Sequence, residues 1–434
     1  MEKNSHRINF ISIVISLFLL CSTDCYADIN FSVDGICYYC RTGLTSVYVT
    51  FFSTDSESNS SRYYGIVTIP NKVTYSDTDY SVNYIGTRAF KGCSNLSNVI
   101  IPTSIKKIYD EAFYNCSSID NIEIPSSVTS IGSKAFSTCS SLKTITLPES
   151  LTEISTSTFY NCTSLESIDI PSNVTSIGSS AFSGCKSLID VVLPSGLTEI
   201  ESSLFLSCSS LKSIDIPEGV TSISYQAFKN CLSLVEIDIP NSVTNISNYA
   251  FYGCVSLSEI SIPNSVTLLN IQAFYGCSNL TTLYLGTGLS KIYKEVFSGC
   301  TSLSDIYCYA TTPPTCSNSS VFDSSTYSSA ILHVPVGTSS DYASATAWEN
   351  FYTIIEDIDA GINEVNVDNG FGEISVSCGR ITISGYKGDI KLYGIGGLLY
   401  SLISSDGSPT SITTPGSGTY ILEIGKESRK IYVK

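Results

Sequence analysis

Apolar and polar residues repeat along the central part of this chain with a period of 23 residues. A cysteine recurs at this interval, with a phenylalanine three residues before it and a leucine, or isoleucine once, three residues after it. A proline ends most of the units. The cysteines are Cys93, Cys116, Cys139, Cys162, Cys185, Cys208, Cys231, Cys254, Cys277 and Cys300. A fixed period of this length is the sequence signature of a solenoid, in which every unit forms one coil.

Within one unit, the pattern predicts a short strand and then a short helical segment. Residues 122–124 alternate apolar, polar and apolar, which is typical of a strand with one buried face. Pro125 ends that strand, because proline has no N–H to extend a ladder. The apolar residues that follow have helical spacing, at i, i+4, i+8 and i+11. They are Ile131, Ala135, Cys139 and Leu142.

One such unit cannot fold alone, because its few apolar side chains cannot offset the entropy lost when 23 residues become ordered. Stacking solves this by aligning equivalent apolar positions into continuous ladders. The predicted fold class is therefore an α/β solenoid of leucine-rich repeat type. We expect one parallel β-sheet on its concave face and short helical or irregular segments on its convex face. A C-terminal β-sandwich follows the solenoid.

The cysteine row has three interpretations. Neighbouring coils bring equivalent cysteines close together, so disulfides are conceivable, yet every thiol would have two equivalent partners between the phenylalanine and leucine rows. Metal binding lacks a histidine or paired carboxylate at a matching offset. Buried free thiols that act as small hydrophobes are the favoured interpretation. The Cys37–Cys40 pair outside the row is interpreted as a disulfide or as two ordinary thiols.

The N-terminus has the pattern of a signal peptide over residues 1–27. A basic start precedes the apolar core from Ile8 to Leu20, and Ala27 offers a cleavage site. Lipid attachment at Cys21 is disfavoured, because the residue before it is large. The apolar core of 13 residues is too short to span a bilayer, and no other transmembrane run follows. We expect the mature chain to be secreted or held at the outer cell surface.

The rest of the chain divides into four predicted parts. They are an N-terminal β cap (28–66), the solenoid (67–308), a C-terminal cap (309–358) and a β-sandwich for sorting or anchoring (361–434). Caps are required because each end of a solenoid exposes core and a strand edge. We expect nine extra residues in the first unit and a last solenoid strand at Ile331–Pro335. Strands of the sandwich are predicted at 373–377, 381–384, 391–393, 398–402, 420–424 and 430–433.

The outward positions of the predicted strands form two rows on the sheet. Eight of their twenty side chains are acidic and none is basic. The acidic residues are Glu123, Asp169, Asp190, Asp215, Glu236, Asp238, Glu259 and Asp305. Like charges that face each other in a ladder repel, as in Asp215 beside Asp238. The rows indicate a cationic partner, either a basic protein or calcium, or else a solvated face of an acidic extracellular protein.

Tyr284 and Tyr307 form an aromatic step at one end of these rows. They could anchor a protein partner, stack on a sugar ring or simply fill the sheet surface.

Composition narrows the function classes. Only 14% of the residues are charged and the net charge is −16, which argues against nucleic acid or an anionic membrane as a partner. The mature chain has one histidine, His333, so any Ser/His/Asp site would have to form around it. An open sheet also offers no water-excluding pocket for paired carboxylates. We therefore expect no enzyme and no cofactor; calcium is conceivable but lacks a motif.

The repeat L-x-x-I-x-I-P-x-x-V-T-x-I-G-x-x-A-F-x-x-C-x-x-L resembles the BspA-like leucine-rich repeats of surface proteins, found chiefly in gut and oral Bacteroidetes. The resemblance covers roughly residues 64–310. The final domain, through residues 390–393, 418–424 and 430–434, is similar to the C-terminal sorting domains of exported Bacteroidetes proteins, although the turn at 394–397 lacks the usual Asp or Asn and basic residue. The resemblance implies an adhesin that binds a host matrix protein or another microbial surface protein.

Three functions remain open at this point. The first is protein binding or adhesion through the acidic rows, which predicts salt-sensitive binding. The second is a glycan-binding module resting on Tyr284 and Tyr307, and the third is a structural spacer that displays its terminal domains.

Overall fold

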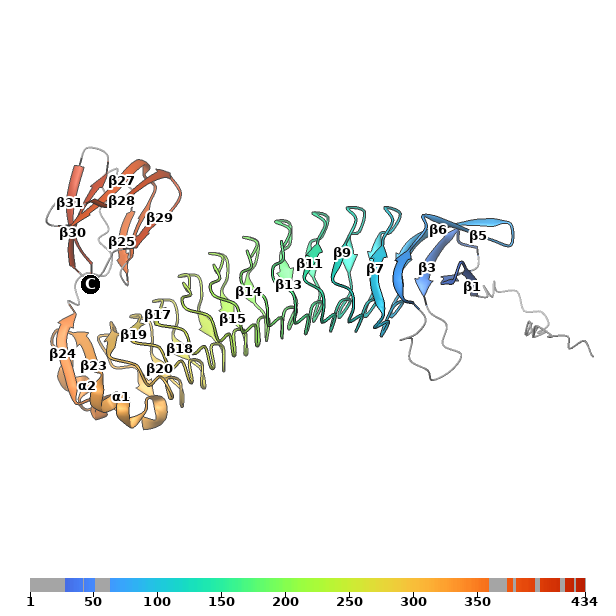
Figure 1. The fold of residues 1–434 in the computed structure, drawn as a ribbon. Coiled ribbons are helices and arrows are strands. Elements are labelled where there is room, and N and C mark those ends of the chain that lie inside the picture. The colour runs from blue at the N-terminus through green and yellow to red at the C-terminus, as the bar shows by residue number, and fades with distance from the viewer. Residues whose placement is uncertain are drawn as a thin grey trace, which may run out of the picture.

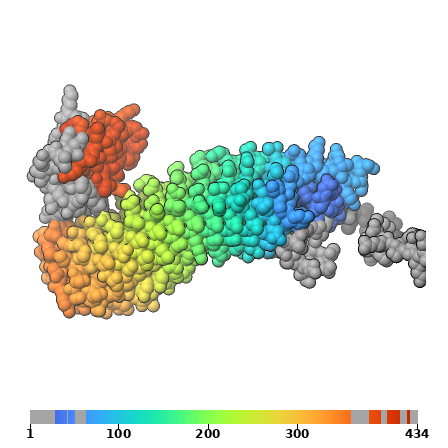
Figure 2. Space-filling model, viewed as in Figure 1, coloured from blue at the N-terminus to red at the C-terminus, as the bar shows by residue number. Residues whose placement is uncertain are grey.

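The computed structural model describes residues 28–41, 43–50, 63–358, 373–377, 380–394, 399–413, 418–424 and 427–433. The expected signal peptide, Cys378 and the greater part of the turn at 394–397 lie outside these residues. Coils stack one behind the next from the blue N-terminal end to the orange C-terminal end (Figure 1). Their side chains close into one continuous, elongated body (Figure 2). The predicted solenoid is confirmed.

The extended segment predicted in each coil is present, and it forms parallel strands at both ends of the array. The paired groups are β4–β7, β9–β11 and β17–β19–β21–β23–β24. The strands are β4 (Gly65–Thr68), β7 (Leu96–Ile100), β9 (Asn121–Glu123), β11 (Thr144–Thr146), β17 (Glu259–Ile262), β19 (Thr282–Leu285), β21 (Asp305–Cys308), β23 (Ile331–Pro335) and β24 (Thr353–Ile358). The strand face is the surface made by the outward side chains of these strands and of the equivalent segments between residues 167 and 239.

The expectation of one continuous sheet on this face is wrong for the middle of the array. Segments between residues 167 and 239 form no regular ladder. The backbone hydrogen bonds between these neighbouring segments lie mainly where each segment begins. Lys212 N donates to Ile189 O at 3.1 Å, and Val235 N donates to Lys212 O at 3.1 Å. Other parts of the coil supply most of the hydrogen bonds that hold these coils together.

A second parallel ladder of two-residue strands runs along another side of the coils. Its strands are β8 (Lys107–Ile108), β10 (Ser130–Ile131), β12 (Glu153–Ile154), β13 (Ser176–Ile177), β14 (Glu199–Ile200), β15 (Ser222–Ile223), β16 (Asn245–Ile246), β18 (Leu268–Leu269), β20 (Lys291–Ile292) and β22 (Thr315–Cys316). Ile131, which was predicted to begin a helical segment, belongs to this ladder.

Tight turns replace the helical segment predicted before each cysteine. Bonds within a coil, such as Cys116 N to Phe113 O at 3.1 Å, alternate with bonds between coils, such as Phe113 N to Ala135 O at 2.7 Å. Two residues per turn segment have positive φ, for example Glu111 at 55° and Asn115 at 59°. A right-handed helix cannot continue through such residues. The apolar positions are nevertheless buried as predicted.

Phenylalanine rings form the centre of the core. From Phe90 to Phe297, successive rings lie 5.0–5.9 Å apart between centroids, with interplanar angles of 5–12°. Phe322 extends this stack into the C-terminal cap, 5.3 Å from Phe297. Each coil therefore contacts the next through a nearly parallel pair of buried rings, as a nearest-neighbour array requires.

The cysteines of the row are buried thiols that form no disulfides, as predicted. Its contacts add a reason for cysteine at this position. From Cys116 to Cys300, every thiol donates to the carbonyl of a phenylalanine in the preceding coil, as Cys139 Sγ does to Phe113 O at 3.1 Å. Cys37 and Cys40 are also buried and are not joined by a disulfide. Burial raises the pKa of Cys139 to about 12.

We expect the row thiols to resist alkylation in the folded protein. A thiol of pKa about 12 is ionised to only about one part in ten thousand at pH 8, and the thiolate is the reactive form. Iodoacetamide should label these cysteines about 1,000-fold more slowly in the native chain than in denaturant. Mass spectrometry of time points measures both rates, and rapid native labelling at Cys139 would contradict the buried thiol row.

A β-sheet cap closes the N-terminal end of the core. Its order is β1–β2–β3–β6–β8–β10, with β5 paired to β6, so the cap continues the two-residue ladder. The added strands are β1 (Ile29–Val33), β2 (Ile36–Cys40), β3 (Ser46–Thr50), β5 (Lys72–Tyr75) and β6 (Thr78–Ile85). The β5–β6 hairpin accommodates the extra residues predicted in the first unit.

The C-terminal cap is built from short helices and one strand beyond the predicted last one. Its helices are η2 (Ser319–Val321), α1 (Ser324–Ser329), α2 (Ser339–Tyr342) and η3 (Trp348–Asn350). Trp348 is fully buried and its Nε1 donates to Pro314 O at 2.7 Å. The added strand is β24, which pairs in parallel with β23, so the sequence-based end of the sheet at Ile331–Pro335 is wrong. No helix in the described part of the chain is long and apolar enough to cross a membrane.

Two antiparallel sheets follow near the C-terminus, with orders β25–β26–β29 and β28–β27–β30–β31. Their strands are β25 (Glu373–Ser377), β26 (Arg380–Ser384), β27 (Lys387–Gly394), β28 (Leu399–Asp406), β29 (Thr410–Thr413), β30 (Gly418–Ile424) and β31 (Glu427–Val433). All six predicted strands are present, and β29 was not predicted. Residues such as Ile383 and Leu392 form a separate core.

Candidate functional site on the strand face

The strand face carries all the side chains that were predicted from the outward rows. Seven of the eight carboxylates are exposed, and Asp305 is half-buried. In the described part of the chain, ion pairs reach only two of the eight: Arg380 on β26 contacts Asp238, and His333 contacts Asp305. The remaining six carboxylates therefore present uncompensated negative charge.

Two carboxylates of neighbouring coils on this face, Asp238 and Glu259, repel each other. The pKa of Glu259 is raised above its usual range, first by burial and then by the negative charge of Asp238 one coil earlier. This is the effect expected when like charges occupy adjacent positions of a parallel array. Asp238 and Glu259 lie 21 residues apart, in different outward rows, so they are not one of the same-row pairs for which repulsion was predicted.

Tyr284 and Tyr307 lie side by side on neighbouring strands, as predicted, and His333 extends them into a stack. The centroids of Tyr284 and Tyr307 are 5.0 Å apart at an interplanar angle of 18°. Those of Tyr307 and His333 are 4.2 Å apart at 12°. Because the rings cover one another's faces, a sugar ring cannot stack on the faces that they share. The stack offers ring edges and polar atoms to a ligand instead.

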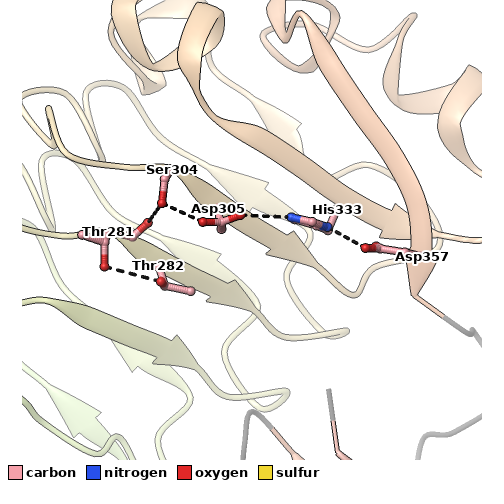
Figure 3. A network of polar contacts seen from close by, with 6 residues as sticks. All are labelled: Thr281, Thr282, Ser304, Asp305, His333 and Asp357. Atoms are coloured by element: carbon pink, nitrogen blue, oxygen red, sulfur yellow. Dashed lines mark hydrogen bonds and ion pairs between the residues drawn. The ribbon is translucent and has the colours of Figure 1, made fainter. Parts of the chain in front are cut away.

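Polar contacts hold His333 between two carboxylates (Figure 3). Its Nδ1 lies 2.8 Å from Asp357 Oδ2, and its Nε2 lies 3.4 Å from Asp305 Oδ1. Ser304 Oγ donates to Asp305 Oδ2 at 2.6 Å. Burial, and then the charges of Asp305 and Asp357, raise the pKa of the Tyr307 hydroxyl. The aromatic stack is thus fixed within an acidic surrounding.

This arrangement suits binding better than catalysis. A Ser/His/Asp site needs a hydroxyl at the second imidazole nitrogen, but both nitrogens of His333 face carboxylates. The Ser304 hydroxyl points to Asp305. Among the described residues, no group of three or more His, Cys, Asp or Glu side chains could hold a metal ion.

Sequence reasoning missed His333 and Asp357 as members of this site. Extending the row that holds Tyr284 and Tyr307 by one more strand would have reached His333. Tyr307 and His333 are 26 residues apart instead of 23, so the fixed period does not extend to His333. Asp357 lies on β24, for which the repeat pattern contains no signal.

Comparisons with known proteins agree with this architecture. The model of the BspA type leucine rich repeat region matches residues 68–189, 106–235 and 221–344. A solved leucine-rich repeat protein from Bacteroides ovatus is 33% identical, with 65% of this chain and 72% of that chain covered and a TM-score of 0.59. A leucine rich cell surface protein from Faecalibacterium prausnitzii is 27% identical, with 65% and 95% covered and a TM-score of 0.35. None of the curated proteins matches the chain.

Proposed function

The chain belongs to the BspA type leucine-rich repeat family, and we propose that it is an exported, non-enzymatic adhesin whose strand face binds a protein with a basic surface. The observation that carries this proposal is the unbalanced charge of the strand face. Eight carboxylates lie along it, and six have no ion-pair partner in the described part of the chain. A host matrix protein or another microbial surface protein with a basic patch is the partner that fits.

The electrostatic repulsion between carboxylates on the strand face supports a binding role for this face. The negative charge of Asp238 contributes, after burial, to the raised pKa of Glu259, so these two carboxylates repel each other in the free protein. A cationic partner would remove this repulsion on binding. Complementary charge also accelerates encounter between proteins at low salt. The aromatic stack at one end would then supply an anchor, since tyrosine is common among residues that dominate binding energy.

The glycan alternative is less well supported by the geometry, because Tyr284 and Tyr307 cover each other's ring faces. The spacer alternative requires only that the outward rows tolerate polar substitution. We propose no cofactor: the rows contain no calcium motif, and binding should be the same with calcium or with a chelator.

A charge-reversal experiment tests the proposal. The test variant combines Asp215→Lys, Glu236→Lys, Asp238→Lys and Glu259→Lys in the mature chain. The control variant carries the same charge change at four exposed residues off the strand face: Glu149→Lys, Glu153→Lys, Glu199→Lys and Glu218→Lys. Both are compared with the unmodified chain for binding to a panel of matrix proteins, basic proteins and glycans at low and moderate salt.

We expect binding of a basic protein that weakens as salt increases, because exposed charges are screened within about 8–10 Å at physiological ionic strength. The test variant should lose at least about 100-fold in affinity, since reversed charges then oppose the partner. The control variant should stay within about threefold. Equal affinities for the test variant and the unmodified chain would overturn the proposal. Salt-insensitive binding that is lost in Tyr307→Ala would favour the glycan-binding alternative. If no member of the panel binds, the spacer alternative would be favoured.

A further inference from the structure

The strand face has an open edge at its N-terminal end. There β4 pairs with β7 alone, while the cap strands β6, β3, β2 and β1 extend the two-residue ladder instead. In the described part of the chain, no strand pairs with the second edge of β4. The cap therefore closes one ladder of the solenoid and leaves the end of the other unpaired.

The backbone geometry of β4 shows which groups this edge presents. Gly65 N donates to Asn95 O at 2.9 Å, and Ile69 N donates to Ile100 O at 3.1 Å, both toward β7. Successive residues of a strand point their N–H and C=O groups to alternate sides. The N–H and C=O groups of Ile66 and Thr68 consequently point away from β7, into the space beside the edge.

That space is a groove of about 570 Å³ between β4, β5 and the β1–β2 hairpin. Ile36, Tyr38 and Val73 belong to its lining but are almost fully buried, and the half-buried Val67 lines it from β4. The charged residues of the lining are Asp34 and Lys72, one of each sign. Specific ligand pockets have volumes of about 300–1,000 Å³. The groove is thus large enough for a peptide segment and has no charge preference.

Side chains on β4 remain exposed on both surfaces of the strand. Tyr64, next to β4, is 74% exposed and Ile66 is 66% exposed, on a face whose other outward residues are mostly polar. On the opposite surface Val67 is half-buried, whereas its equivalents Val99 and Ile122 are 2% and 3% exposed. One additional strand beside β4 would cover both surfaces.

The sequence of β4 carries neither of the chemical protections common on edge strands. Natural edges are protected by lysine, proline, bulges or very short strands. Residues 65–68 read Gly-Ile-Val-Thr, with no charge and no proline. Its protections are its length of four residues and the register irregularity at the first of them. An edge without charge or proline beside a groove can pair with an added strand.

We propose that the groove beside β4 binds an uncharged, extended peptide segment of another protein, which pairs with β4 as an additional strand of the strand face. The four residues of β4 span about 13 Å, so the segment would pair over about four or five residues. Apolar side chains at alternate positions would contact Val67, and those between them would lie near Ile66. A second copy of β4 fits less well, because its own hairpin and β5 would have to enter the same groove.

The test uses the full mature chain and a capped, uncharged heptapeptide of alternating valine and threonine. Amide exchange of Ile66 and Thr68 is followed by NMR with and without the peptide. We expect fast exchange at both amides in the free chain and at least tenfold slower exchange at saturating peptide. Two N-methylated peptides are the matched controls. Methylation at the alternate residues that face β4 should abolish binding, and methylation at the intervening residues should leave it intact.

A protein variant gives a second test. Ile66→Pro removes one outward N–H, and proline is tolerated at strand edges when the lost N–H does not pair within the sheet. We expect at least tenfold weaker peptide binding for Ile66→Pro and unchanged binding for Val192→Thr, a control at an exposed outward position several coils away from the groove. If Ile66→Pro fails to fold, the N-methylated peptides decide the outcome.

Four results would overturn the proposal. The first is slow exchange of the Ile66 and Thr68 amides in the free chain, and the second is that the peptide does not bind. The third is that both N-methylated peptides bind as tightly as the unmodified peptide. The fourth is that the free chain forms a dimer that is lost in Ile66→Pro. The charge-reversal variant of the acidic rows should bind the peptide normally, so this proposal and the proposed function can fail independently.

Discussion

Replacing Phe205 by alanine is expected to lower the free energy of unfolding by about 3–5 kcal/mol. The ring is fully buried and stacks on Phe182 at 5.7 Å and on Phe228 at 5.5 Å between centroids. Alanine would leave a cavity in the middle of the ring stack and remove both contacts at once. Because stability in a repeat array is a sum of neighbour interactions, the array should also begin to unfold in two parts.

Urea denaturation followed by circular dichroism measures the effect. The unmodified chain should show one steep transition for the solenoid, and Phe205→Ala should show an earlier and broader one. Lys212→Ala, at an exposed position seven residues further on, serves as the control and should change stability by no more than about 0.5 kcal/mol. A loss below about 1 kcal/mol for Phe205→Ala would mean that the ring stack contributes little, contrary to its burial.

Replacing Trp348 by alanine is expected to have an effect of similar size at the C-terminal end, about 3–5 kcal/mol. Trp348 packs against Phe322, Tyr342 and Phe351, and its indole nitrogen satisfies the buried carbonyl of Pro314. Without it, the end of the phenylalanine stack would meet water and a buried carbonyl would lose its donor.

Loss of the cap should also make the protein associate. An uncapped solenoid exposes core and an unpaired ladder, which are surfaces for aggregation. Light scattering during thermal unfolding should therefore show association at lower temperature for Trp348→Ala than for the unmodified chain. Glu349→Ala, an exposed neighbour, is the matched control. Equal transition temperatures in all three proteins would show that the cap is dispensable.

The buried positions of this solenoid stabilise the stack, whereas its outward positions are available for binding. Buried positions repeat almost without change, because each phenylalanine and each cysteine must fit the same position in the next coil. Outward positions on the strand face differ from coil to coil, since solvent imposes no such demand. Binding specificity can therefore be placed on the outward rows and on the β4 groove without disturbing the stack.

The amino-acid sequence alone determined the solenoid, its buried rows, the free thiols and the acidic strand face. A buried position that recurs every 23 residues occurs in the same environment each time, so the period identifies the core without a structure. The helical segment was wrong because the spacing of Ile131 and Ala135 reports only which side chains share a face. It does not report the positive φ values, at positions such as Glu111 and Asn115, that convert this segment into stacked turns.

The features that depend on where the regular repeat stops follow from the three-dimensional packing and could not be predicted from the period. His333 joins Tyr307, and Asp357 joins His333, through strand pairings whose sequence steps are not 23 residues. The open edge of β4 arises because the N-terminal cap continues one ladder and not the other. A repeating pattern specifies contacts between equivalent residues of neighbouring coils. At the ends of the array no equivalent coil follows, so long-range packing of the cap residues determines which surfaces are covered and which remain available for binding.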